Sequence, residues 1–144
     1  MPLLTNFYKT PIASSIQVCS RISVSRTQFR YFSSFPALKM IKDVKTVEEF
    51  RTAINDDKIA VIDFYATWCG PCKMVAPQVH KFSEQFTDGI EFYKVDVDEL
   101  SEVASEVNVR AMPTFMLFKK GEKIKEIVGA NPSALKTAIT AALA

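Results

Sequence analysis

The chain reads Trp68-Cys69-Gly70-Pro71-Cys72 at the point where strand-like sequence gives way to helix-like sequence. Before this turn, residues 59–65 are apolar apart from Asp63, a pattern typical of a strand covered on both faces of a sheet. After it, apolar residues recur at helical spacing, which predicts a helix over 71–86 that Pro77 kinks. These apolar residues are Met74, Val75, Val79, Phe82 and Phe86. A buried strand that runs directly into a helix predicts an α/β domain.

The remaining periodic segments predict a mixed β-sheet between helices on both faces. Thr46 and Glu49 form a capping box, so a short helix is expected to begin there and to end near Asn55. The other expected elements are strands over 39–43, 90–97, 114–119 and 123–128, a helix over 100–107, and a last helix that begins at Asn131-Pro132. The final two strands are so close in sequence that they must pair as an antiparallel hairpin. The predicted order of elements is β-α-β-α-β-α-β-β-α.

The composition is that of an ordinary globular domain, since 48% of the 144 residues are hydrophobic and 24% are charged. The chain has only four glycines, which are far apart, so neither a dinucleotide fingerprint nor a phosphate-binding loop can be drawn. No segment approaches the roughly 20 consecutive apolar residues that a membrane-spanning helix needs. One folded domain with a tail is therefore predicted, with no membrane as a partner.

The N-terminal segment differs from the rest of the chain in charge. It is basic and has no acidic residue before Asp43, whereas the remainder is net acidic, which argues against a nucleic-acid-binding domain. It is also rich in Ser and Thr, and its apolar runs are too short for a secretory signal. This composition is typical of an organellar presequence, and Arg30-Tyr31-Phe32-Ser33 resembles the site at which mitochondrial matrix peptidases cut. Residues 1–37 are therefore predicted to be a mitochondrial presequence, cut near Phe32, in front of a domain over 38–144. A basic tail without a targeting role and a chloroplast address are the alternatives.

Cys69 and Cys72 form an isolated C-x-x-C, because the third cysteine, Cys19, lies in the N-terminal segment. A zinc site would need two further ligands, and His80 is the only histidine in the chain. A static disulfide would close too small a loop to constrain the unfolded chain much, and a matrix location would keep it reduced. We therefore expect a redox-active dithiol and no metal, since residues i and i+3 in the first turn of a helix are close enough for a disulfide to open and close.

The two cysteines are expected to have different roles. The N–H groups at the helix N-terminus stabilise a thiolate, so Cys69 is expected to be the nucleophile, open to a protein substrate beside Gly70. Cys72, one turn deeper, is expected to be the sheltered thiol that attacks second. Pro71 fits the first turn because it has no N–H to lose, and with Gly70 it is expected to tune the reduction potential.

Asp63 lies on the predicted strand that leads to the cysteines. Buried beneath the pair and short of partners, its carboxyl should have a raised pKa. It is then suited to accept the proton of Cys72, directly or through a water molecule. The alternative is an aspartate at the edge of the sheet that faces solvent.

From residue 38 onward the chain resembles the thioredoxin family. The W-C-G-P-C motif is intact, and residues 73–77 match the family's kinked second helix. Asp63 falls on the family's buried aspartate, and Lys94 falls on the lysine that accompanies it. One departure is Tyr65, where many members carry a second tryptophan. An aromatic ring can still pack there, so no loss of chemistry is expected.

The resemblance also implies a substrate groove. Met112 and Pro113 fall on the family's cis-proline loop, and Gly129 falls on the glycine loop that borders the groove together with Trp68. A cis bond between Met112 and Pro113 is implied, with the backbone of Met112 pairing to an extended substrate segment as in strand addition.

The resemblance implies a thioredoxin fold and a monomeric protein disulfide reductase of the mitochondrial matrix. Such a protein binds no cofactor and takes its electrons from NADPH through a separate flavoprotein, thioredoxin reductase. Peroxiredoxins are the implied clients. Two other functions fit the same fold: a disulfide-forming or isomerising enzyme, against which the Gly-Pro between the cysteines argues, and a non-catalytic scaffold subunit in which the dithiol is incidental.

Overall fold

Five strands form one mixed sheet in the computed structural model, which describes residues 41–144. The strands are β1 (Lys42–Val44), β2 (Ile59–Tyr65), β3 (Ile90–Asp96), β4 (Thr114–Lys119) and β5 (Glu122–Val128), in the spatial order β1-β3-β2-β4-β5. β3 is parallel to β1 and to β2, whereas β4 is antiparallel to β2 and to β5. The predicted mixed sheet and order of elements are confirmed. The predicted presequence lies outside the described residues.

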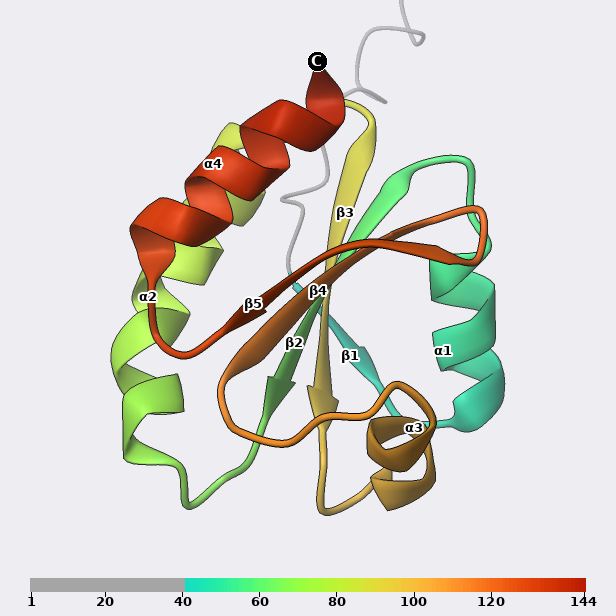
Figure 1. Ribbon diagram of the computed structural model, residues 1–144, viewed down its shortest axis with the longest axis vertical. Coiled ribbons are helices and arrows are strands. Elements are labelled where there is room, and N and C mark those ends of the chain that lie inside the picture. The colour runs from blue at the N-terminus through green and yellow to red at the C-terminus, as the bar shows by residue number, and fades with distance from the viewer. Residues whose placement is uncertain (1–40) are drawn as a thin grey trace, which may run out of the picture. The chain divides into compact units, whose positions relative to one another are not determined.

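Helices cover both faces of this sheet, as predicted (Figure 1). The helices are α1 (Val47–Ile54), α2 (Gly70–Gln85), α3 (Ser101–Glu106) and α4 (Pro132–Leu143). α2 and α4 lie on one side, and α1 and α3 on the other (Figure 1). Thr46 is confirmed as the N-cap of α1, since its hydroxyl accepts a hydrogen bond from the backbone N–H of Glu49 at 3.1 Å, whereas the carboxylate of Glu49 accepts from the N–H of Lys45 and not from that of Thr46 as a capping box requires. Pro77 lies inside α2 and does not end it.

The alternating side chains of β2 divide the core into two layers. Ala60, Ile62 and Phe64 pack with α1 and α3, whereas Ile59 and Val61 pack with α2 and α4. A central strand that is covered on both faces has a nearly continuous apolar sequence, and this is why the sequence pattern located β2 correctly.

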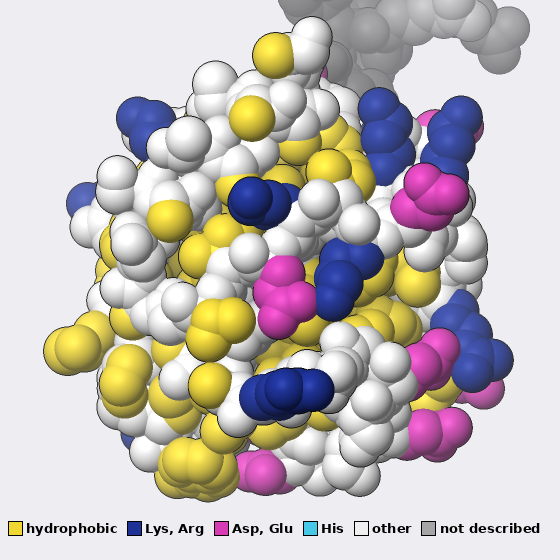
Figure 2. All heavy atoms as spheres, viewed as in Figure 1, with side chains coloured by type: hydrophobic (Ala, Val, Ile, Leu, Met, Phe, Trp, Pro, Cys, Tyr) yellow, Lys and Arg dark blue, Asp and Glu magenta, His cyan; other side chains and the backbone are white. Residues whose placement is uncertain are grey.

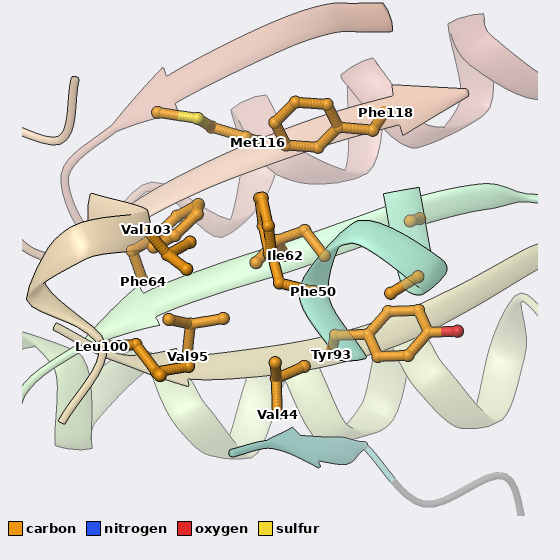
Figure 3. Close-up of a cluster of buried hydrophobic side chains, with 12 residues drawn as sticks. Val44, Phe50, Ile62, Phe64, Tyr93, Val95, Leu100, Val103, Met116 and Phe118 are labelled. Atoms are coloured by element: carbon orange, nitrogen blue, oxygen red, sulfur yellow. The ribbon is translucent and has the colours of Figure 1, made fainter. Parts of the chain in front are cut away.

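Figure 3 shows the layer between the sheet and α1 and α3. The ring of Phe50 on α1 lies 6.3 Å from that of Phe64 on β2 and 6.0 Å from that of Phe118 on β4, measured between centroids. These spacings suit tilted and edge-to-face contacts between aromatic rings. This layer fixes β2 from the side opposite the cysteines.

Two details of the sequence prediction were wrong. The first strand ends at Val44, one residue beyond the predicted end, because Lys42–Val44 are the residues that pair with β3; the predicted residues 39 and 40 lie outside the described residues. Met74 is 74% exposed although it was grouped with the apolar face of α2. The buried stripe of α2 contains Val75 and Val79, and a residue one position before Val75 is turned by about 100° out of that stripe.

Within residues 41–144, no helix is both long and apolar enough to cross a membrane.

Candidate active site

The two cysteines of the motif lie where β2 leads into α2. Cys69 is the N-cap residue of α2, and its Sγ accepts a hydrogen bond from the backbone N–H of Cys72 at 3.2 Å. The two cysteines form a disulfide with their Cα atoms 5.4 Å apart. Pro71 occupies the first turn of α2, where its missing N–H costs no hydrogen bond. The structure is therefore that of the oxidised protein, with the sulfur of Cys69 at the positive end of a helix.

The burial of the cysteines differs from expectation. Cys72 is sheltered as predicted, at 5% exposure, but Cys69 is equally buried at 4%. In the disulfide both residues pack in one small cluster with Ala66, against which Met112 also packs. Exposure therefore does not distinguish the two cysteines in the oxidised protein. The asymmetry between them lies in their positions along α2, since Cys69 caps the helix and Cys72 lies within it.

Hydrophobic side chains surround this end of the molecule. In Figure 2 they are exposed at the lower left, where Figure 1 shows β2 leading into α2. Trp68, next to Cys69, is 66% exposed, and its indole Nε1 donates a hydrogen bond to Oδ2 of Asp98 at 2.9 Å. Asp98 follows β3, and its backbone N–H donates to Oδ1 of the buried Asp96 at 3.0 Å. The orientation of the exposed indole is thus fixed from the end of the neighbouring strand.

The loop before β4 provides the other wall of the site. The bond between Met112 and Pro113 is cis, as the resemblance implied. The hydroxyl of Thr114 donates to the carbonyl of Ala111 at 2.7 Å, which closes the loop on itself. The N–H of Gly129 donates to the carbonyl of Pro113 at 2.8 Å, and Gly129 has a φ of 92°. The proline and glycine loops are therefore adjacent, as a shared groove requires.

Asp63 is buried in the middle of the sheet, with 8% of its surface exposed. Its Oδ1 has no hydrogen-bond partner among the described residues. Burial raises the pKa of this carboxyl to about 7, and the positive charge of Lys94 opposes the rise. Asp63 and Cys72 both line a pocket of about 380 Å³ on the α2 side of the sheet. The expected burial and raised pKa of Asp63 are confirmed, and the alternative of a solvent-facing aspartate is wrong.

Lys94 lies beside Asp63 but forms its ion pair elsewhere. The two residues are partners in the register of β2 and β3. The Nζ of Lys94 lies 3.4 Å from Oδ2 of Asp43 and 5.5 Å from the centre of the Tyr65 ring. Tyr65 therefore does place an aromatic ring at the position where many members of the family carry tryptophan.

Residues 41–144 hold no group of three or more His, Cys, Asp or Glu side chains that could bind a metal ion. His80 is exposed on α2, and its Nδ1 lies 3.4 Å from Oε1 of Glu84, one turn along the same helix.

Comparisons with known proteins agree with this geometry. The sequence profile named Thioredoxin matches residues 41–141. The chain belongs to the thioredoxin family. It is 57% identical to thioredoxin-1 of Saccharomyces cerevisiae over 102 residues, which are 71% of this chain and 98% of that protein.

Two solved yeast structures are also similar. The mitochondrial thioredoxin 3 of S. cerevisiae in its oxidised form is 46% identical, with a TM-score of 0.66 over 70% of this chain and 94% of that one. A chain from a study of how the yeast mitochondrial 1-Cys peroxiredoxin is resolved through glutathione and thioredoxin systems is also 46% identical. Its TM-score is 0.67 over the same shares of the two chains. This thioredoxin is thus a thiol-disulfide oxidoreductase, with its redox pair at Cys69 and Cys72.

Two residues of this thioredoxin's site were missed by the sequence analysis. Asp98 binds Trp68, and Asp43 binds Lys94. Asp98 could have been found, because the carboxyl ends of the parallel strands β2 and β3 lie at the same edge of the sheet, and Asp98 follows β3 as Trp68 follows β2. Asp43 could not, because its contact depends on the pairing of β1 with β3.

Proposed function

We propose that the protein reduces disulfides of other proteins in two exchange steps, with Cys69 as the attacking thiol and Cys72 as the resolving thiol. The observation that carries this is the disulfide between Cys69 and Cys72, closed at the N-terminus of α2 with Cys69 as the cap. The Cys69 thiolate attacks one sulfur of the substrate disulfide, forms a mixed disulfide and releases the other sulfur as a thiolate. The Cys72 thiolate then attacks the sulfur of Cys69, and the second substrate thiolate leaves. Two electrons pass from the dithiol to the substrate.

Asp63 is proposed as the group that accepts the proton of Cys72 before the second step. A carboxyl with a pKa of about 7 is a much stronger base than an exposed aspartate. Asp63 and Cys72 line the same pocket, which leaves room for transfer directly or through a water molecule. Lys94 has an auxiliary role, since its charge opposes the rise in the pKa of Asp63.

The substrate is proposed to lie across Trp68, Met112, Pro113 and Gly129. Trp68 offers a large exposed apolar surface beside Cys69. Met112 packs against the cysteine cluster, so an extended segment paired with its backbone would pass close to the disulfide. Gly70 and Pro71, between the cysteines, are proposed to tune the reduction potential.

The cellular setting is proposed from the N-terminal segment and the relatives. The composition of residues 1–37 and the likeness to a yeast mitochondrial thioredoxin support a mitochondrial matrix protein, with residues 38–144 as the working domain. The likeness to a chain studied with a mitochondrial peroxiredoxin supports peroxiredoxins as substrates. We propose that the protein acts as a monomer without a bound cofactor. Electrons would come from NADPH through a separate thioredoxin reductase.

The test is the reduction potential of the Cys69–Cys72 pair, set against a glutathione buffer. A value near −270 mV is expected for a reductant, whereas one between about −180 and −120 mV would indicate an isomerase or oxidant instead. With a disulfide-containing protein as substrate, Cys72→Ser should accumulate the mixed disulfide and Cys69→Ser should form none. Cys19→Ser is the matched control and should behave as the wild type. Trapping of substrate by Cys69→Ser would refute the assigned roles.

A further inference from the structure

Three charged side chains form a row across the sheet beneath α2. Lys94 on β3 is the register partner of Asp63 on one neighbouring strand and of Asp43 on the other. Paired residues of adjacent parallel strands point to the same face of a sheet. One ammonium group thus lies between two carboxyls, of which Asp63 is buried and Asp43 is at the edge strand.

The ammonium group of Lys94 pairs with the outer carboxyl. Its Nζ is 3.4 Å from Oδ2 of Asp43, and no ion pair joins Lys94 to Asp63 among the described residues. The Oδ1 of Asp63 has no hydrogen-bond partner there either. The ring of Tyr65, two residues after Asp63 on the same face of β2, also contacts the ammonium group. Asp43 and Tyr65 thus provide alternative partners for the one cation beside Asp63.

We propose that Asp43 is a positioning residue that holds the ammonium group of Lys94 away from Asp63 and so keeps Asp63 basic enough to accept the proton of Cys72. The inference rests on the proton-accepting role proposed above for Asp63. It adds a residue of the edge strand, which touches neither cysteine, to the control of the second exchange step.

The other charged and titratable groups around Asp63 do not replace this contact. They are Tyr65 on β2, Asp96 on β3, Lys45 after β1, and Cys72 and Lys73 on α2. Lys45 also lies 3.4 Å from Asp43, but its Nζ is closer to Glu99, at 2.8 Å. Asp43 therefore pairs with both lysines at the same distance, and Lys94 has no other ion-pair partner among the described residues. Lys94 is the one charged group that shifts the pKa of Asp63 among these residues, and it does so downward.

The direction of the effect follows from the charges. The side chain of Lys94 is 39% exposed, so it is free to reorient once its partner is lost. With Asp43 neutral, the ammonium group can approach Asp63 and stabilise its carboxylate, which lowers the pKa of Asp63. Asp63 then becomes a weaker base. In the pH–rate profile of the second exchange step, the rise on the acid side should move to lower pH, and the maximal rate should fall.

The test is an NMR titration of the Asp63 carboxyl in the oxidised full-length protein, in which the cysteines do not titrate. Asp43→Asn is expected to lower the titration midpoint of Asp63 by roughly 0.5 to 1 pH unit. A fully buried ion pair would give a larger shift, but Lys94 is partly exposed. Asp43→Glu keeps the charge and should stay near the wild-type midpoint. Glu106→Gln is the matched control: it removes an exposed carboxylate that pairs with Arg51 and with neither Lys94 nor Lys45, and should leave the midpoint unchanged.

Lys94→Met decides whether Asp43 acts through Lys94. In a Lys94→Met background, Asp43→Asn should no longer move the midpoint of Asp63. An equal shift with and without Lys94 would show that the charge of Asp43 acts directly, and no shift in the single variant would show that it does not act at all. Either result overturns the inference. The proposed role of Asp63 is tested separately: it fails if Asp63→Asn resolves the mixed disulfide with the wild-type pH profile, whatever the titrations show.

Discussion

Replacing Asp63 with asparagine should stabilise the oxidised protein, and by an amount that depends on pH. The folded protein raises the pKa of this carboxyl from 3.8 to about 7 because the site is buried. Each pKa unit is equivalent to 1.36 kcal/mol, so this pKa difference destabilises the folded protein by about 4 kcal/mol at a pH where Asp63 is ionised both in the folded and in the unfolded chain. The unfolded chain releases the proton near pH 3.8, while the folded protein keeps it until about pH 7. The cost is therefore absent below pH 3.8, grows between these values, and is complete above pH 7.

Asparagine has a similar shape and carries no charge, so it leaves a neutral polar group like that of the protonated acid. Asp63→Asn is expected to raise the free energy of unfolding by about 4 kcal/mol at pH 8 and by under roughly 1 kcal/mol at pH 4. The measurement is urea unfolding of the oxidised protein, followed by far-UV circular dichroism at pH 4, 5.5 and 8. Asp57→Asn is the control, since the side chain of Asp57 is 91% exposed and its loss should change stability by no more than about 0.5 kcal/mol. An equal gain at pH 4 and pH 8 would refute the reasoning, because ionisation could not then be the cause.

Three further predictions concern the site and the core. Trp68→Phe removes the hydrogen bond to Asp98 from an exposed ring, so the free energy of unfolding should fall by only about 1 kcal/mol, as measured by urea unfolding. The KM for a protein disulfide should rise several-fold in steady-state kinetics. Leu135→Ala should cost about 2–5 kcal/mol because this side chain is fully buried between α4 and the sheet, and the half-exposed Leu143→Ala should cost far less in the same unfolding assay. Gly121→Ala should lower stability by roughly 1–2 kcal/mol, seen as a lower Tm, because Gly121 has a φ of 81° and the added Cβ would meet the side chain of Asn55.

Local sequence patterns located most of the elements because each one has its own cause within a few residues. The N-cap at Thr46 sets the start of α1, and the run of residues 59–65, apolar apart from Asp63, is typical of a covered central strand. The redox pair at Cys69 and Cys72 could be recognised for the same reason, since its spacing and its place at a helix start are local properties. The predicted location in mitochondria also comes from local composition, and it stays a prediction.

Some features depended on contacts that the sequence does not show. Met74 was assigned to the apolar face of α2, but the sheet covers only the stripe that contains Val75 and Val79. Cys69 is buried in a cluster against which Met112 packs, and Met112 is 43 positions further along the chain. The cis bond before Pro113 was implied by resemblance, since sequence alone does not choose between the isomers.

From the sequence, a dithiol could be placed at the start of a helix and a lone acid on the buried strand before it. How basic that acid is depends on contacts that form only in the folded protein. The basicity of Asp63 depends on its burial and on where the nearest cation points, and Lys94 points to Asp43. These three residues lie on strands β2, β3 and β1, which are distant in sequence and adjacent only in the sheet. Electrostatic energy depends on distance in space and on exclusion of water, and neither quantity is written in the order of residues.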